Sequence, residues 1–462
     1  MDNKQYIVAL EIGSSKIVGA IATHSALAGV SVVAVEEESV VDCVRYGVIQ
    51  NIEEVNTRVG RIIHKLENRA VVAPRKIKSL YVGVQGRSMH NYVAQVSKQF
   101  TETTITEKVI DEMKTECREI AKKQIDGFEI VGTIPRKYLV DKTETQKPVG
   151  TLGSSIDAYF NLIIAKPQVR GNIRRLMEKQ QVEVNGYFVV PNCVAEAVLS
   201  NEERRLGCML VDFGAETTTV SIYKNDVLIY LATIPVGSRN ITKDITALNI
   251  LEERAEEIKK SVGNANVQPS DKSVLIYDIN SGDINNYVAA RSGEIVANIM
   301  AQLEYAKCTV EDIPGGIIIV GGGVKLKGFA DVIATQYKGK IREGNIDSVD
   351  FTNTKAQGVE YVPVVSMLCR AARVMKAGAS CCSEPPSIGD ATGGATTTTG
   401  STTTTTTTPA TPANGDDEKK PKKKSPGKIA TLFGSIKTKV ANIFEEPEEG
   451  EDEDDEEDNN DE

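Results

Sequence analysis

Residues 208–224, CMLVDFGAETTTVSIYK, decide the fold of this chain. The apolar run CMLVDF ends at a turn of small residues, and a second strand-like run, TTVSIYK, follows it directly. Short apolar runs separated by a small-residue turn are typical of two strands joined in a hairpin. Residues 6–23, YIVALEIGSSKIVGAIAT, repeat this pattern near the N-terminus. Two such openings about two hundred residues apart predict a duplicated α/β architecture with a cleft between its halves.

Three glycine-centred turns carry the candidate chemistry: EIGSSK at 11–16, VDFGAETTT at 211–219 and IIIVGGGVKLKGF at 317–329. In the first turn, backbone N–H groups and a lysine can surround a phosphate. In the second, an aspartate at a strand end can hold Mg²⁺ through water. In the third, bare glycine backbone allows a base or sugar to approach closely. An ordinary hairpin or strand-to-helix connection also explains each turn taken alone, so only their order is informative.

The charge of the chain is concentrated at its end. The formal net charge is −10, but residues 445–462 contain 14 acidic residues and no Lys or Arg. Residues 414–444 hold eight lysines and three acidic residues, which leaves the rest of the chain nearly neutral. A neutral body argues against nucleic acid as a partner. The eight cysteines form no CxxC pair and lie mostly in apolar runs, so we expect reduced, buried thiols.

The C-terminal region combines a linker with an amphipathic segment. Residues 381–427 are rich in Thr, Ser and Pro, a composition that is typical of a disordered linker. Residues 428–444 place apolar side chains at helical spacing beside several lysines. This stripe needs a surface to bury it, either an anionic membrane or a groove in a partner protein. Its apolar residues are Ile429, Leu432, Phe433, Ile436, Val440, Ile443 and Phe444.

The N-terminus lacks the charged and apolar regions of a signal peptide, and no apolar stretch approaches ~18 residues. We therefore expect a cytoplasmic protein without a membrane-spanning helix. Residues 85–161 differ from their flanks, with polar strand-like pieces around a charged helix near 107–124, and we interpret them as an inserted subdomain. Outside this insertion, the periodicity predicts helices at 53–69, 252–262 and 287–307 and a strand at 77–84.

Along the chain, a first hairpin is followed by a second hairpin that contains an Asp, then by a charged helix (AEEIKK, 255–260) and then by the glycine turn. This order resembles that of the actin-like ATPase superfamily. The segments VGTIPRKYLVD (131–141), KPVGTLGSSI (147–156), VLSNEERRLGCMLVDFG (198–214) and IPVGSRNITKDI (234–245) resemble bacterial cell-division FtsA proteins. The resemblance runs from residue 5 to about 378 and is renewed by the amphipathic segment. It implies an actin-like, ribonuclease H-like duplicated fold with two lobes around a nucleotide cleft and an FtsA-type 1C subdomain.

The resemblance also implies a division into subdomains. Subdomain 1A comprises residues 1–84, 162–205 and, at its end, 355–380. Subdomain 1C is 85–161, subdomain 2A is 206–241 and 301–354, and subdomain 2B is 242–300. The linker (381–427), the amphipathic membrane-targeting helix (428–444) and the acidic tail (445–462) follow.

By the same resemblance, ATP and Mg²⁺ are the expected ligands. Glu11 and Asp212 would lie near the Mg²⁺ water shell. The residues expected to contact the nucleotide are Gly13, Ser14, Ser15 and Lys16; Asp212, Gly214, Thr217 and Thr218; Gly237 and Ser238; Glu256, Lys259 and Lys260; and Gly321, Gly322, Gly323 and Lys325. A solvated helix face is the alternative interpretation of Glu256 and the two lysines of its helix.

Three positions limit the catalytic interpretation. Most of the superfamily has a glycine where this chain has Glu216, and Thr219 replaces a frequent Asp. A carboxylate aimed at the terminal phosphate would repel it, so either Glu216 points away or nucleotide affinity is reduced. Glu196 falls in the segment that links the halves, near where relatives have a residue that orients the attacking water, or it is an exposed polar helix residue. The sequence thus favours ATP binding, and at most slow hydrolysis.

The implied function is that of a cell-division protein that polymerises and tethers the tubulin-like FtsZ to the inner face of the cytoplasmic membrane at the septum. The implied partners are the FtsZ C-terminal peptide, bound by subdomain 2B, further copies of the chain, other divisome proteins and an anionic membrane surface. The acidic tail is not part of this family picture. The alternatives are a PilM-type pilus-assembly homologue and an ATPase of the sugar-kinase or Hsp70 type.

Overall fold

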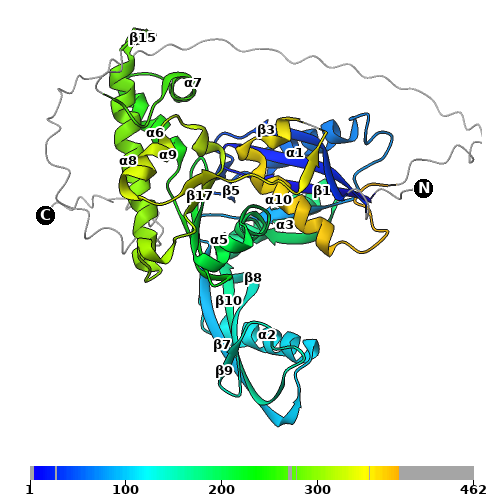
Figure 1. Cartoon of the computed structure of the whole chain (residues 1–462). Helices are drawn as coiled ribbons and strands as arrows, with labels where there is room; N and C mark the ends of the chain where they lie inside the picture. The colour runs from blue at the N-terminus through cyan, green and yellow to red at the C-terminus, as the bar shows by residue number, and fades with distance from the viewer. Residues whose placement is uncertain (1–4, 26–28, 269–272, 277, 353, 384–462) are drawn as a thin grey trace, which may run out of the picture. The chain divides into compact units, whose positions relative to one another are not determined.

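The first half of the protein is built on a mixed six-stranded sheet in the order β11-β6-β1-β2-β3-β19 (Figure 1). The computed structural model describes residues 5–25, 29–268, 273–276, 278–352 and 354–383. The strands of this sheet are β1 (Gln5–Ile12), β2 (Lys16–Ser25), β3 (Gly29–Ser39), β6 (Ser79–Val84), β11 (Glu183–Val189) and β19 (Val349–Phe351). β1, β2 and β3 pair antiparallel, whereas β6 lies parallel to β1 and β11 parallel to β6.

The second half repeats this arrangement. Its sheet begins in the order β18-β17-β12-β13-β14, which matches β11-β6-β1-β2-β3 strand for strand. β12, β13 and β14 pair antiparallel, and β17 and β18 continue the sheet in parallel, as β6 and β11 do in the first half. The strands are β12 (Cys208–Phe213), β13 (Thr218–Lys224), β14 (Val227–Ile234), β17 (Ile317–Val320) and β18 (Ile341–Glu343). The structure therefore confirms the predicted duplication.

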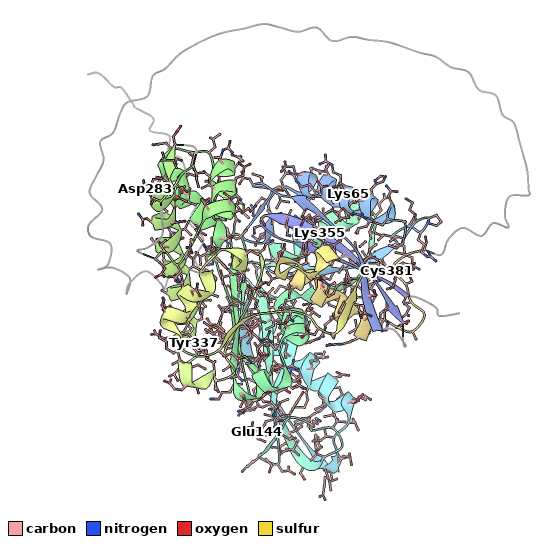
Figure 2. The ribbon with its side chains drawn as sticks, turned by 45° about the horizontal axis from the view of Figure 1, so that its top comes forward. Lys65, Glu144, Asp283, Tyr337, Lys355 and Cys381 are labelled. Carbon is pink, nitrogen blue, oxygen red and sulfur yellow. The ribbon has the colours of Figure 1, made fainter. Side chains whose placement is uncertain are left out.

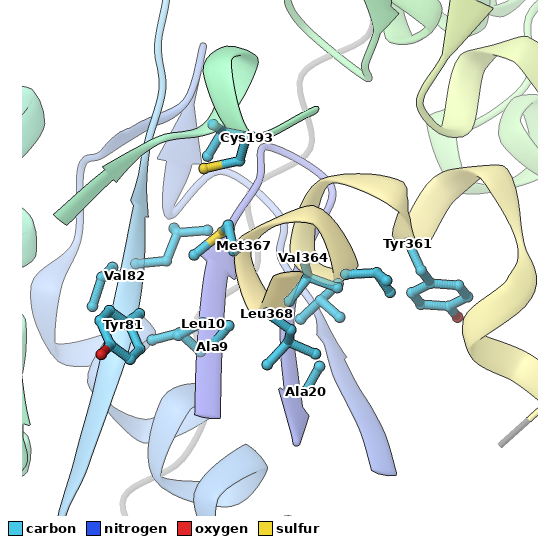
Figure 3. Packing of buried hydrophobic residues seen from close by; sticks show 14 of the residues in the cluster. Ala9, Leu10, Ala20, Tyr81, Val82, Cys193, Tyr361, Val364, Met367 and Leu368 are labelled. Carbon is cyan, nitrogen blue, oxygen red and sulfur yellow. The ribbon is translucent and has the colours of Figure 1, made fainter. Parts of the chain in front are cut away.

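Helices from distant parts of the chain cover the first sheet. α10 (Val362–Val374) packs on β1 and β2 beside α4 (Val190–Val198), and Figure 3 shows Val364, Met367 and Leu368 of α10 facing Ala9, Leu10 and Ala20. α1 (Ile52–Glu67) packs against β2 and β3 and also contacts α3 (Pro167–Gln180). α1 approaches β2 so closely that a Cβ at Gly19 would lie 2.4 Å from Ile62 Cγ2. This packing of helices on a sheet buries the first core.

A second core lies between the second sheet and its helices. These helices are α6 (Ser238–Ile245), α7 (Glu252–Val262), α8 (Ser281–Tyr305) and α9 (Phe329–Gln336). Phe213 of β12 stacks on Phe329 of α9 with ring centroids 4.3 Å apart. α8 begins at Ser281, six residues before the predicted start near 287, because Asn280 caps it by accepting a hydrogen bond from Gly282 N at 2.7 Å. α5 (Asn201–Leu206) precedes β12.

The predicted insertion has a core of its own. β7 (His90–Thr104), β8 (Glu129–Val140), β9 (Thr143–Thr145) and β10 (Leu152–Ala165) form an antiparallel sheet covered by α2 (Glu107–Lys122). The predicted helix near 107–124 thus has almost the observed bounds. β7 also pairs with β14, so this sheet continues the sheet of the second half and the combined sheet has nine strands. The sequence patterns do not predict this connection.

Smaller elements complete the described chain. They are β4 (Val44–Arg45) and β5 (Val48–Ile49), β15 (Leu275–Ile276) and β16 (Ile279–Asn280), and the 3₁₀ turns η1 (Thr246–Leu248), η2 (Val310–Asp312), η3 (Gly322–Lys325), η4 (Thr354–Gln357) and η5 (Val359–Tyr361). All eight cysteines are unpaired and seven are buried, as expected for structural thiols. Among the described residues, no helix combines the length and apolarity that crossing a bilayer requires. The predictions for 384–462, including the amphipathic helix, fall outside the described residues.

Candidate functional site

The first two predicted turns have the same geometry. Gly13 N donates to Lys16 O at 3.0 Å in the turn between β1 and β2, and Gly214 N donates to Thr217 O at 2.9 Å in the turn between β12 and β13. A Cβ at Gly13 would lie 3.0 Å from Lys16 O, and a Cβ at Gly214 would lie 2.9 Å from Thr217 O. The strand registers agree too. In both hairpins the first strand pair joins the residue before the glycine to the residue after the one whose carbonyl oxygen accepts the hydrogen bond of the turn. The two candidate phosphate loops are therefore equivalent members of the duplication.

An acidic residue precedes each of these turns by two positions. Glu11 and Asp212 are the penultimate residues of β1 and β12 and lie close enough for their charges to interact. Burial, with the charge of Asp212 as a second cause, raises the pKa of Glu11 to about 7, and burial raises the pKa of Asp212 to about 6. Two such carboxylates are the hard oxygen ligands that Mg²⁺ prefers. They fit the expected cation, whose charge would favour their ionised forms.

Other residues complete the surroundings of this acidic pair. Gln85, directly after β6, donates from Nε2 to Glu11 Oε1 at 3.2 Å. No cluster of three or more Asp, Glu, His or Cys side chains within the described ranges is arranged to hold a metal. Water and phosphate oxygens would therefore have to fill most positions around an ion held by Glu11 and Asp212. This is the usual arrangement for Mg²⁺, which keeps several waters in protein sites.

The third turn, after β17, packs directly on the second half's acidic residue. Gly321 has φ +94°, and a Cβ there would lie 2.5 Å from Asp212 Oδ1. A Cβ at Gly323 would lie 2.5 Å from the ring of Phe213. Packing thus explains two of the three glycines, whereas a Cβ at Gly322 would meet only Glu360 Cβ, at 3.8 Å. Gly322 is the position where a ligand could approach the bare backbone.

The predicted residues of α6 and α7 lie against the second turn. Ser238 N donates to Gly214 O at 3.0 Å, and a Cβ at Gly237 would lie 2.4 Å from Ala215 O. Lys259 Nζ donates to Ser238 O at 3.0 Å and pairs with Glu256 at 2.6 Å. Burial lowers the pKa of Lys259, against the opposing charge of Glu256. Lys259 is therefore a buried residue that joins α7 to α6, not part of a solvated helix face.

Glu256 and Lys260 complete the predicted group on α7. Glu256 accepts a hydrogen bond from Thr242 Oγ1 at 2.5 Å and also pairs with Lys260 at 3.1 Å. Burial opposes the shift, but the charge of Lys259 lowers the pKa of Glu256 on balance. Lys260 is largely exposed, so it is the member of this group that the solvated-face interpretation describes best.

The two predicted lysines of the turns are held by carboxylates of the first half. Lys16 Nζ donates to Glu37 Oε2 at 2.9 Å and lies 4.1 Å from the ring centroid of Tyr361. Lys355, labelled in Figure 2, and Tyr361 also donate to Glu37. Burial opposes the shift, but the hydrogen bonds from Lys355 and Lys16 lower the pKa of Glu37 to about 2. Lys325 is paired with Glu360 at 2.8 Å, so both lysines would have to exchange partners to contact a phosphate.

Glu216 is buried and held by protein partners. Its side chain is only 4% exposed and lies between Arg45 of the first half and Arg239 of the second. Tyr46 N donates to Glu216 Oε2 at 2.6 Å. The side chain therefore has protein partners on both sides, which the sequence analysis did not foresee.

Glu196 has a structural environment that differs from the predicted one. It forms ion pairs with Arg370 and Arg373 of α10. Its role as the residue that orients water stays a prediction. Gln85, which bonds Glu11 directly, is a second candidate for that role, and the sequence analysis missed it. Its signal was its place at the end of the strand predicted at 77–84, where polar residues of parallel strands converge.

The repeated sheets, the paired turns and the inserted subdomain define a two-lobed, actin-like protein. Residues 209–366 match the family model described as cell division protein FtsA, and residues 86–164 match the SHS2 domain inserted in FtsA. FtsA of Porphyromonas gingivalis is 31% identical over 379 residues, covering 78% of this chain and 77% of the relative. FtsA of Bacillus subtilis is 26% identical over 392 residues, covering 81% and 86%. The chain belongs to the FtsA family of cell-division proteins.

A solved structure supports the fold independently. The chain in the PilM-PilN type IV pilus biogenesis complex aligns with a TM-score of 0.57 and 14% identity, covering 79% of this chain and 98% of that one. At this identity the similarity concerns the fold alone. Family membership therefore favours the cell-division interpretation over the pilus-assembly and sugar-kinase alternatives.

Proposed function

We propose that this chain binds ATP and Mg²⁺ between its two halves, assembles into protofilaments and tethers FtsZ to the membrane at the septum. Membership of the FtsA family makes it an actin-like cell-division protein. The observation that carries nucleotide binding is the matched pair of turns, each preceded by an acidic residue, with Glu11 and Asp212 close together. In this proposal, ATP acts mainly as a conformational and assembly switch.

Each proposed contact has a specific chemical role. The N–H groups of the turns at 13–16 and 214–218 would donate to phosphate oxygens, and Glu11 and Asp212 would hold the water shell of Mg²⁺. The ion would neutralise phosphate charge. Gln85 is positioned to orient a water beside Glu11. Because this glutamine is neutral and Glu196 is paired with arginines, neither is an evident strong base, and we expect slow hydrolysis.

A nucleotide-binding experiment tests this site. A fluorescent ATP analogue is titrated into the wild-type chain, Asp212→Asn and the control Asp226→Asn, with and without Mg²⁺. Asp226 lies in the exposed turn after β13, where Asn also tolerates the observed φ of +65°. We expect Asp212→Asn to lose at least about tenfold in Mg²⁺-dependent affinity, because one of two carboxylates is removed. Equal affinities for the two variants would contradict the proposed site.

The proposed membrane attachment depends on residues 428–444. A single amphipathic helix binds a bilayer weakly, whereas a polymer that carries many copies binds by avidity. Sedimentation with anionic liposomes, with and without ATP, compares the full chain with a truncation before Lys428. Loss of pelleting in the truncated chain alone supports the tether. Unchanged pelleting would refute it and leave the protein-groove alternative.

The proposed FtsZ site lies in residues 242–300. Two leucines of this region, Leu251 and Leu275, are 77% and 75% exposed, and Val274 is also exposed. Exposed apolar side chains of this size favour a protein partner. We expect Leu251→Ser and Leu275→Ser to weaken binding of the FtsZ C-terminal peptide, with exposed Leu206→Ser as the control. Unchanged peptide affinity in both variants would show that the FtsZ site does not include these leucines.

A further inference from the structure

Residues 45–47 link the two candidate phosphate loops. Tyr46 and Gly47 form the two-residue turn of the β4–β5 hairpin, in which both have positive φ, +50° and +78°. Tyr46 N donates to Glu216 Oε2 at 2.6 Å, and Gly47 N donates to Ser14 Oγ at 2.8 Å. The turn thus touches both candidate phosphate loops at once.

Two guanidinium groups add positive charge beside this turn. Arg45 Nε lies 3.0 Å from Glu216 Oε1, and Arg239 Nη1 donates to the same oxygen at 3.2 Å. The Nε atom of Arg45 is buried and makes no hydrogen bond in spite of this short distance. Arginine pairs and backbone N–H groups are the donors that proteins use for phosphate.

The second phosphate loop holds this arrangement in place. Ser238 N and Arg239 N donate to the carbonyl oxygens of Gly214 and Ala215 at 3.0 and 2.7 Å. Arg239 is therefore fixed relative to the loop that carries Glu216. Gly47 is equally fixed, because a Cβ there would lie 2.9 Å from Gly86 Cα. The receptor for an anion is built, and a carboxylate of the protein occupies it.

We propose that Glu216 occupies the place that the terminal phosphate of a nucleoside triphosphate would take, so that the chain prefers a nucleoside diphosphate. The inference rests on the proposed nucleotide site and adds a specificity-determining residue to it. Arg45 and Arg239 face three carboxylates, those of Glu216, Asp42 and Glu252, so their charge is already more than neutralised. A terminal phosphate must therefore either displace Glu216 or be repelled by its negative charge. A diphosphate lacks this terminal phosphate and can bind without displacing Glu216.

The test measures the affinities of Mg-ADP and Mg-ATP for the full chain by calorimetry. The variant is Glu216→Gln, which keeps the shape and the acceptor for Tyr46 N but removes the charge. The control is Glu257→Gln, an exposed glutamate of α7 that pairs with Arg254. Glu216→Gly is a second variant with the residue most common at this position in the superfamily, and thermal unfolding checks that each variant is folded.

We expect the wild-type chain to bind Mg-ADP more tightly than Mg-ATP. Glu216→Gln should strengthen Mg-ATP binding about tenfold, equivalent to about 1.4 kcal/mol, with a change below about threefold for Mg-ADP. Glu257→Gln should leave the ratio of the two affinities unchanged. A ratio that is the same in the wild type and both Glu216 variants would overturn this inference while leaving the nucleotide site intact. Absence of binding in all variants would instead reject the proposed site, and the inference with it.

Discussion

Replacing Glu11 with Gln should stabilise the protein in the absence of ligand, and more at high pH than at low pH. The pKa of Glu11 is raised from 4.5 to about 7 in the folded chain, so the folded state binds more protons than the unfolded state between these values. Stability from this group is complete below about pH 4.5 and is lost as the pH rises through about 7. The full shift corresponds to about 3 kcal/mol, of which about 2 kcal/mol is lost between pH 5.5 and pH 8.

Thermal unfolding at pH 5.5 and pH 8 measures this effect. At pH 8 we expect Glu11→Gln to melt a few degrees above the wild type, with a smaller difference at pH 5.5. Glu116→Gln, an exposed glutamate of α2, is the control and should show no such pH dependence. Added Mg²⁺ and ATP should stabilise the wild type more than Glu11→Gln, because the carboxylate is lost. A melting difference that is equal at both pH values would refute the reasoning.

Four other substitutions test the third turn of the site and the packing around it. Gly321→Ala should lower the melting temperature, because a Cβ would clash with an Asp212 oxygen at a φ that L-residues rarely adopt, whereas Gly322→Ala should fold normally and weaken only nucleotide binding. Arg342→Ala should cost about 3 kcal/mol in urea unfolding, because it leaves the buried carboxylate of Glu203 without its bidentate partner at 2.7 and 2.8 Å. Asn161→Leu should cost about 2 kcal/mol and make the insertion more susceptible to proteolysis, because its buried amide bonds β14. Wild-type stability of Gly321→Ala, Arg342→Ala or Asn161→Leu would contradict the corresponding assignment, and so would a destabilised Gly322→Ala.

The sequence predicted the repeated unit of the fold well because that unit is local. A hairpin with a small-residue turn depends on neighbouring residues, so the turns at 13–16 and 214–217 and their acidic residues could be found from spacing. The helices at 52–67, 107–122 and 252–262 were found almost as observed, because their apolar periodicity and polar flanks are strong. The start of α8 was missed because a cap depends on one side chain, not on periodicity.

Long-range partners could not be predicted from the same patterns. Glu216 in the sequence is a charge in a turn, and nothing near it indicates that Arg45, about 170 residues earlier, lies beside it. Gln85 and Glu11 are 74 residues apart, and Glu196 and Arg370 are 174 residues apart, so these pairs are also long-range. Such contacts depend on how the two halves and their helices pack, which no local propensity specifies.

The amino-acid sequence alone thus determined the duplication, the candidate nucleotide loops and the family, because these depend on short motifs and their order. Only the tertiary structure decided how the halves are joined. It showed that β14 of the second half pairs with β7 of the insertion, and that a carboxylate of one phosphate loop lies between arginines of both halves. The physical reason is that strand edges and buried charges need partners, and the partners are chosen by the packing of the whole chain.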